Sequence, residues 1–224
     1  MDLTVRDVAK LFNVPQRTVN LWIKEGKIPF RKALDRYCFN RAELLEWALA
    51  QNISLPRDIF EEEEAKKYFP DVCNALKNGG IYYGVKGNNR NEVLQAAVNA
   101  LNLPAAVDKN FLLSVIIARE EMVSTGVGDG IAIPHPRNPM VLPGQASLIA
   151  LCFLEKSVDF AAIDAKPVDC LFILISATVR VHLHLLSRLA FILQDSQVKE
   201  AIKKQDCAEN ILQAFERVEK ERAK

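Results

Sequence analysis

The chain has 224 residues, of which half are apolar and a quarter are charged, a composition typical of soluble globular proteins. Its net charge of +1 excludes a chain that binds polyanions over its whole surface. No apolar run approaches the roughly 20 residues that a membrane-spanning helix needs. The first residues lack the basic-then-apolar layout of a secretory signal, and the length allows one large domain or two small ones.

The five cysteines are widely spaced and form neither a C-x-x-C pair nor a disulfide pattern. Two of them, Cys152 and Cys170, lie in apolar runs and are expected to be buried thiols. We therefore expect a reducing, cytoplasmic location, with no metal site and no bound cofactor.

The first fifth of the chain predicts short helices. Thr4 is a candidate N-cap residue, with Asp7 in capping-box spacing. Pro15 opens a second helix that Gly26 ends. Residues 36–39 alternate like a short strand, and a third helix follows them.

Residues 52–78 predict a linker, because Pro56 and Pro70 flank four consecutive glutamates at 61–64. Four like charges in a row favour a solvated segment. A short helix is expected within this stretch, around residues 72–76. The predicted organisation is therefore a domain over 1–51, a linker over 52–78 and a domain over 79–222.

Helices and strands alternate after Gly79. The expected strands cover residues 81–85, 146–154 and 168–176, and the expected helices cover 90–101, 108–121, 182–193 and 197–217. The last strand is apolar nearly throughout, as expected when both faces of a sheet are covered. Interleaved elements of this kind predict an α/β layered domain.

The most informative motif is residues 125–136, TGVGDGIAIPHP. Its three glycines at alternate positions permit tight backbone geometry, and they lead to His135, which prolines flank. The chain has only three histidines, and an imidazole in such a setting suggests chemistry near neutral pH. On the residues alone, a structural histidine in a turn is an equally good interpretation.

Three N-terminal segments resemble winged helix-turn-helix domains of the MerR-like and excisionase-like type. They are LTVRDVAKLFNV at 3–14, RTVNLWIKEGKIP at 17–29, and RYCF at 36–39 followed by ELLEW at 43–47. They correspond in order to the first helix and turn, the recognition helix, and the wing with its closing helix. The resemblance covers about the first 50 residues and implies binding to duplex DNA.

The charge of this segment fits that resemblance. Residues 1–41 hold nine lysines and arginines against four acidic residues, an excess of five positive charges. Gln16, Arg17 and Asn20 would read base edges from the start of the second helix. The candidate phosphate contacts are Lys24, Lys27, Arg31, Lys32 and Arg36. The alternative is a helical protein-docking module whose charges are only solvated.

A second set of motifs resembles the IIA domain of the bacterial phosphotransferase system, in the mannitol/fructose class. The motifs are RE at 119–120, STGVGDGIAIPH at 124–135, KPVD at 166–169 leading into LFIL, and HLHLL at 182–186. Within that class they are most similar to the nitrogen-regulatory IIA-like proteins, over about residues 79–216. The resemblance implies an α/β sandwich with a mixed sheet flanked by helices.

The resemblance also implies a site. It aligns the active histidine of the family with His135, its arginine with Arg119 and its second histidine with His182, and it favours Nε2 as the phosphoryl acceptor. A neutral imidazole can attack a phosphoryl group, while an arginine supplies planar donors to its oxygens. Backbone N–H groups of the turn at 126–130 would cradle the group or orient the ring. Alternatively, Arg119 caps a helix end or pairs with Glu120 or Glu121. His184 is expected to be structural.

These features predict a regulatory phosphotransferase that takes a phosphoryl group onto His135 from a phosphorylated histidine carrier protein. It would act on regulatory protein targets and on duplex DNA, without membrane insertion. One alternative is a transcription factor with an unphosphorylated IIA-like sensor domain. Another is a sugar-specific IIA component that feeds a IIB partner.

Overall fold

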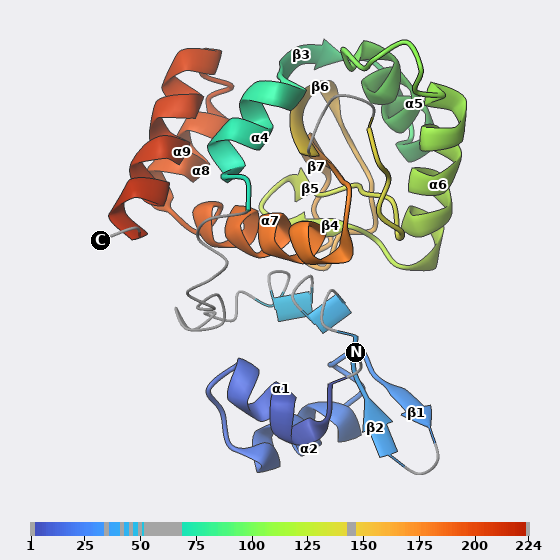
Figure 1. The fold of residues 1–224 in the computed structure, drawn as a ribbon, viewed down its shortest axis with the longest axis vertical. Coiled ribbons are helices and arrows are strands. Elements are labelled where there is room, and N and C mark those ends of the chain that lie inside the picture. Colours follow the sequence, from blue (N-terminus) through green and yellow to red (C-terminus); the bar gives the residue numbers. More distant parts are fainter. Residues whose placement is uncertain are drawn as a thin grey trace. The chain divides into compact units, whose positions relative to one another are not determined.

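The computed structural model describes residues 3–33, 36–40, 43–44, 47–48, 51, 69–142 and 147–222. The chain forms two compact units, Met1–Tyr68 and Phe69–Lys224 (Figure 1). Residues 52–68, which include the glutamate run at 61–64 and most of the predicted linker, lie outside the described residues. No helix within the described ranges is long and apolar enough to cross a membrane.

The first unit has the predicted order of two helices and a wing. Its elements are α1 (Val5–Leu11), α2 (Gln16–Lys24), β1 (Arg31–Ala33) and β2 (Arg36–Cys38), the two strands being antiparallel. The capping box is confirmed: the Asp7 amide donates to the Thr4 hydroxyl at 3.3 Å, and the Thr4 amide donates to the Asp7 carboxylate at 2.9 Å. Gly26 ends α2 with a φ of +65°, so both predicted helix boundaries are explained by local chemistry.

Three aromatic rings hold the helices of the first unit together. Phe12, Trp22 and Trp47 meet edge to face, with ring centroids 5.1 to 6.2 Å apart. Trp47 lies where the third helix is predicted, and residues 43–44 and 47–48 have helical backbone. Leu45, which we expected on the same helix, lies outside the described residues.

The second unit is built on a five-stranded mixed sheet in the order β3-β6-β7-β5-β4. The strands are β3 (Ile81–Val85), β4 (Gly126–Gly128), β5 (Ile131–Ala132), β6 (Ser147–Val158) and β7 (Val168–Ser176). The central pair β6 and β7 is antiparallel, whereas β3 runs parallel to β6 and β5 parallel to β7. This confirms the mixed sheet.

Helices cover both faces of the sheet (Figure 1). They are α4 (Val72–Gly79), α5 (Arg90–Ala100), α6 (Lys109–Met122), α7 (Val179–Ile192), α8 (Ser196–Lys203) and α9 (Ala208–Arg222). Cys152 and Leu171 lie opposite each other and belong to the core beneath α5 and α6. Phe172 faces the other way and stacks on Phe215 of α9 at 6.1 Å, because alternate residues of a strand point to opposite faces.

The buried thiols are confirmed. Cys152 and Cys170 are free and buried. Burial raises the pKa of the Cys152 thiol to about 12, so this cysteine is protonated and inert at neutral pH.

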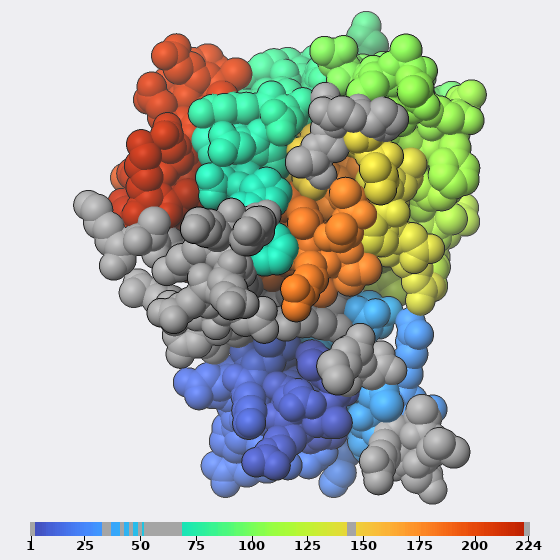
Figure 2. Space-filling model, viewed as in Figure 1, coloured from blue at the N-terminus to red at the C-terminus, as the bar shows by residue number. Residues whose placement is uncertain are grey.

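Two predicted elements differ from the structure. The helix expected over 197–217 is two helices, α8 and α9, because the chain turns at Gln205, whose φ is +49°. Residues 72–78, which we assigned to the linker, form most of α4, so the short helix expected around 72–76 is confirmed but belongs to the second unit. Helix α4 packs against β6 and α9, and Figure 2 shows it beside α9. The packing is close, since a Cβ on Gly79 would lie 2.2 Å from the Ile149 carbonyl oxygen.

A half-buried carboxylate, that of Glu219, connects the start of α4 to α9. Glu219 accepts hydrogen bonds from the Val72 amide at 2.8 Å and the Cys73 amide at 3.0 Å. Arg188 lies 3.9 Å from the same carboxylate. Burial outweighs these favourable contacts and raises the pKa of Glu219 above its usual value of 4.5.

The raised pKa gives a testable pH dependence. The native state holds the Glu219 proton more tightly than the unfolded chain does. The carboxyl therefore contributes stability below pH 4.5 that is lost as the pH rises through its native pKa. Glu219→Gln removes this titration. The free energy of unfolding of the variant minus that of the parent, from urea melts between about pH 4 and 7, should increase with pH. A difference that does not change with pH would refute the account.

Candidate functional site

The backbone on both sides holds the segment that carries His135. The Ile133 amide donates to the Thr125 carbonyl at 3.0 Å, and the Leu174 amide of β7 donates to the Pro134 carbonyl at 3.0 Å. These bonds place His135 beside the C-terminal part of β7. The side chain is nearly buried, with 2% of its surface exposed.

One hydrogen bond sets the protonation of the His135 ring. Its Nδ1 lies 2.7 Å from the Ile133 carbonyl oxygen. A carbonyl oxygen can only accept, so Nδ1 must carry the proton. In the neutral ring the lone pair is then on Nε2, which is the nitrogen able to attack an electrophile.

The first turn of α7 brings a second imidazole to this ring. Thr178 caps the helix by accepting a hydrogen bond from the Val181 amide at 3.2 Å. His182 follows, and its ring centroid lies 4.9 Å from that of His135. His184 lies two residues further along and stacks instead on Phe69, at 4.7 Å. The structure thus brings His135 and His182 into contact, the two histidines that the family resemblance assigns to the site. His184 instead packs on Phe69.

Arg119 lies in the last turn of α6 and is buried. Its Nη1 donates to the Val123 carbonyl at 2.8 Å, which is the helix-capping role that we considered as the alternative. The end of α6 also lies next to the segment after His135, since Arg137 contacts the Met122 sulfur at 3.3 Å.

Sequence reasoning missed the role of Glu120. Its buried carboxylate accepts from the Thr125 amide at 3.1 Å and from the Thr125 hydroxyl at 2.5 Å. Arg90 lies 3.8 Å away. Thr125 in turn holds Ile133, and Ile133 holds the His135 ring, so Glu120 is a positioning residue for the histidine. Its only sequence signal is a carboxylate that directly follows Arg119.

The structure shows a local role for the glycine turn, while its expected part in cradling a phosphoryl group or orienting the ring stays a prediction. Gly128, Asp129 and Gly130 all have positive φ, at +93°, +52° and +76°, and form a tight turn. The Gly130 carbonyl accepts from the Asp169 amide at 2.7 Å, at the start of β7. His135 lies beside Leu174, about 16 Å further along that strand. The glycines serve the turn, since a Cβ on Gly130 would lie 2.5 Å from the Asp169 carboxylate.

Large apolar side chains are exposed on the segments that carry the candidate site. Met122 and Val123 at the end of α6 are 56% and 66% exposed, Val141 is 75% exposed and Val179 is 59% exposed. Exposed apolar side chains around a polar centre are typical of surfaces that bind other proteins. Among the described residues no group of three or more His, Cys, Asp or Glu could hold a metal ion.

The predicted base-reading residues share one face of α2. Gln16, Arg17 and Asn20 are exposed, as is Lys24. Leu21 lies among them, 52% exposed. The spacing of three and four residues puts these side chains side by side, as required of a helix that reads the major groove.

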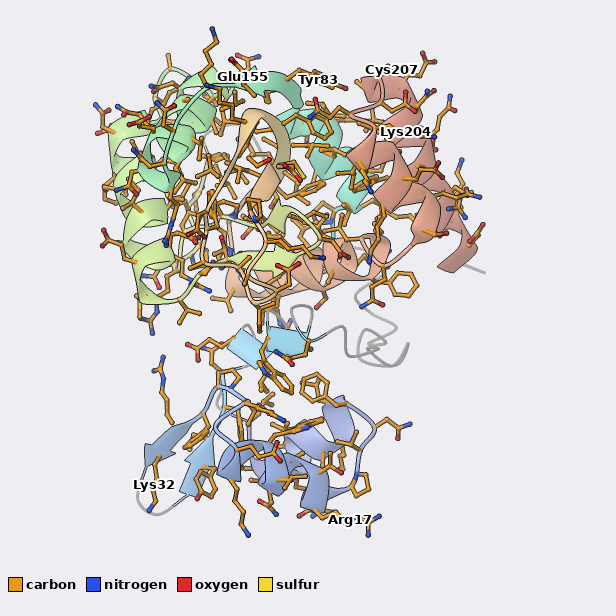
Figure 3. All side chains as sticks on the ribbon, turned by 180° about the vertical axis from the view of Figure 1, so that it is seen from behind. Arg17, Lys32, Tyr83, Glu155, Lys204 and Cys207 are labelled. Carbon is orange, nitrogen blue, oxygen red and sulfur yellow. The ribbon has the colours of Figure 1, made fainter. Side chains whose placement is uncertain are left out.

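The predicted phosphate contacts are partly paired with acidic neighbours. Lys27 lies 2.8 Å from Glu25, and Arg31 lies 3.1 Å from Glu43. Such exposed pairs are weak and exchange easily for a phosphate. Arg17 and Lys32 project outward from the first unit (Figure 3). The side chain of Arg36 lies outside the described residues.

Comparison with known proteins identifies both units. Residues 74–218 match the family model of the phosphoenolpyruvate-dependent sugar phosphotransferase system, EIIA 2. Residues 3–52 match a helix-turn-helix domain.

Several relatives match the second unit. The nitrogen regulatory protein of Pseudomonas aeruginosa is 36% identical over 143 residues, which are 62% of this chain and 90% of that protein. The nitrogen regulatory protein of Escherichia coli is 33% identical over 123 residues, 54% of this chain and 72% of that protein. The mannitol-specific phosphotransferase enzyme IIA component of Staphylococcus aureus is 30% identical over 145 residues, 65% of this chain and 97% of that protein.

Solved structures agree with this assignment. The crystal structure of the nitrogen regulatory protein IIA-Ntr from Neisseria meningitidis superposes with a TM-score of 0.54 at 25% identity, covering 68% of this chain and 99% of that one. A putative PTS IIA domain from Streptococcus pyogenes, at 20% identity and a TM-score of 0.53, shares the fold over 66% of this chain and 96% of its own. Because the family model spans more than half of its length, the chain belongs to the EIIA 2 family of the phosphoenolpyruvate-dependent sugar phosphotransferase system, with a helix-turn-helix domain at its N-terminus.

Proposed function

We propose that this chain is a regulatory phosphocarrier that accepts a phosphoryl group on Nε2 of His135 from a phosphorylated histidine carrier protein. The observation that carries the proposal is the contact between Nδ1 of His135 and the Ile133 carbonyl. It leaves the lone pair on Nε2, in a ring that contacts His182.

The transfer is a displacement at phosphorus. The Nε2 lone pair of His135 attacks the phosphorus, and the bond between phosphorus and the carrier's ring nitrogen breaks. The leaving imidazole keeps the electron pair and takes up a proton. Nδ1 of His135 keeps its proton and its bond to Ile133, so the ring need not reorient.

Phosphoryl transfer depends mainly on position and on positive charge near the equatorial oxygens. We assign these tasks to Arg119 and His182. The planar guanidinium of Arg119 is a charged donor suited to phosphoryl oxygens, and it lies at the end of α6. The exposed apolar residues of the same segments, such as Met122 and Val179, would bind the carrier protein.

A regulatory role is supported by the helix-turn-helix match and by the relatives that are named nitrogen regulatory proteins. In this proposal the first unit binds duplex DNA, with Gln16, Arg17 and Asn20 at base edges. The phosphorylation state of His135 would then be coupled to transcription or to regulatory protein targets. A second candidate function is that of a sugar-specific IIA component, which the similarity to the mannitol-specific relative supports. Transfer of the phosphoryl group from this chain to a IIB protein would show that function.

His135 is expected to be the sole acceptor. Incubation with phosphoenolpyruvate, the first enzyme of the system and the carrier protein should add one phosphoryl group to the intact mass. His135→Ala should abolish the added mass, and His184→Ala should retain it because His184 packs on Phe69. Full labelling of His135→Ala would overturn the assignment. An unlabelled parent chain would favour the unphosphorylated sensor.

Arg119 is expected to assist the transfer. Arg119→Ala should slow phosphorylation by roughly two to three powers of ten, the loss typical of one charge-stabilising donor. Rapid-quench kinetics measures the rate of phosphorylation. A thermal melt of the parent and the variant measures the loss of stability that comes from removing the helix cap. Unchanged kinetics in a folded variant would leave Arg119 with the capping role alone.

Glu120 should act through the position of the His135 ring. Glu120→Gln leaves Thr125 with a poorer acceptor and should lower the free energy of unfolding by about 1–3 kcal/mol. It should also shift the ¹⁵N resonances of His135 and slow phosphorylation. The matched control is Glu121→Gln, because Glu121 is the adjacent, exposed carboxylate. Equal behaviour of the two variants would argue against a positioning role.

DNA binding by the full chain should weaken steeply as salt rises, because phosphate contacts release counterions. Arg17→Ala should reduce discrimination between sequences, whereas Lys32→Ala should weaken binding about equally on all of them. Fluorescence anisotropy with a selected and a scrambled duplex measures both effects. If no duplex binds in a salt-dependent way at low ionic strength, the first unit is a protein-docking module.

A further inference from the structure

A cavity of about 700 Å³ lies in the second unit, away from the histidines. It is enclosed by the turn between β4 and β5, the end of β6, the start of β7 and α8. Asp169 and Cys170, at the start of β7, line it, whereas His135 lies beside Leu174. No residue of the candidate transfer site lines this cavity.

The floor of the cavity is apolar. It is formed by Ile131, Phe153, Cys170 and Ile202, each at most 5% exposed. These residues come from β5, β6, β7 and α8, so the floor forms only in the folded second unit. An apolar floor of this size is typical of a site for a small organic molecule, for which 300–1,000 Å³ is the usual range.

The rim of the cavity is positively charged. Lys166, Lys199 and Lys203 line it together with the carboxylates Asp129 and Asp169. Lys199 is 2.7 Å from Asp129, and Asp169 accepts a hydrogen bond from Ser157 at 2.5 Å. Lys166 is 3.7 Å from Asp164.

Lys203 differs from the other two lysines. Its ammonium group makes no ion pair with any acidic residue that the structure describes, although it borders the cavity. An ammonium group is a compact point charge that suits a phosphate or a carboxylate. The rim therefore offers one uncompensated cation directly above an apolar floor.

We propose that this cavity binds an amphipathic organic anion, whose apolar body lies on the floor and whose phosphate or carboxylate binds Lys203. The site depends on the fold of the second unit and not on phosphorylation of His135. It would give the protein a small-molecule input that is separate from the transfer site.

The test uses 8-anilinonaphthalene-1-sulfonate, an aromatic anion that fluoresces in apolar sites, with the full chain. Saturable binding is expected, and Lys203→Glu should weaken it about tenfold, as expected for the loss of one charged contact. The matched control is Lys204→Glu. Lys204 is the next residue, its side chain is 64% exposed, it pairs with Glu200 at 2.7 Å and it does not line the cavity.

Both variants have the same net charge, so a general electrostatic effect would weaken binding equally and would overturn the proposal. Absence of saturable binding, or binding unchanged by Lys203→Glu, would also overturn it. Amide shifts on titration should cluster at Gly130, Cys170 and Lys203; shifts confined to the exposed residues Met122 and Val123 would contradict the site.

Competition then identifies the acidic group. An adenine mononucleotide supplies a phosphate and an aryl carboxylate supplies a carboxylate, each on an apolar ring. Displacement of the dye by either one supports the proposal, and the more effective competitor names the preferred anion. If neither competitor displaces the dye, the cavity is not a site for anions of this class.

Discussion

The chemistry of the second unit depends on the hydrogen bond from Nδ1 of His135 to the carbonyl of Ile133, two residues earlier in the chain. This bond fixes the tautomer of the ring and so decides which nitrogen can act as a nucleophile. It is a local contact that needs an extended backbone at Ile133 and Pro134. That backbone is held in turn by β4 through Thr125 and by β7 through Leu174. His135 is thus positioned by strand packing, with Glu120 holding Thr125.

The remaining parts of the site are layered around this bond. Glu120 holds Thr125 from α6, and the cap at Thr178 starts α7 so that His182 meets the His135 ring. Helix α6 ends in this region and α7 begins there. In the proposed transfer, Arg119 of α6 and His182 of α7 would stabilise the negatively charged transferring group. In the same proposal, the exposed apolar residues on these segments would bind the carrier protein that delivers the phosphoryl group.

Much of the fold could be predicted from the sequence because it depends on local patterns of residues. The apolar run of β7 and the capping box at Thr4 follow from periodicity and spacing, whereas the pairing of His135 with His182 was implied by the resemblance to the IIA family. The break between α8 and α9 could not be predicted, since it depends on a left-handed Gln205 inside a pattern that stays helical. The contact of the glycine turn with Asp169 could not be predicted either, because it joins residues 39 positions apart. The cavity that Lys203 lines likewise forms only when distant elements pack together.

The most direct test is to determine which ring nitrogen carries the phosphoryl group. The full chain, labelled with ¹⁵N at histidine and phosphorylated by the carrier protein, can be examined by ¹H, ¹⁵N and ³¹P NMR. The account predicts that ³¹P couples to Nε2 of His135 while Nδ1 keeps its proton and its bond to Ile133. A phosphoryl group on Nδ1 would contradict it, because that nitrogen would first have to give up the bond on which the site is built.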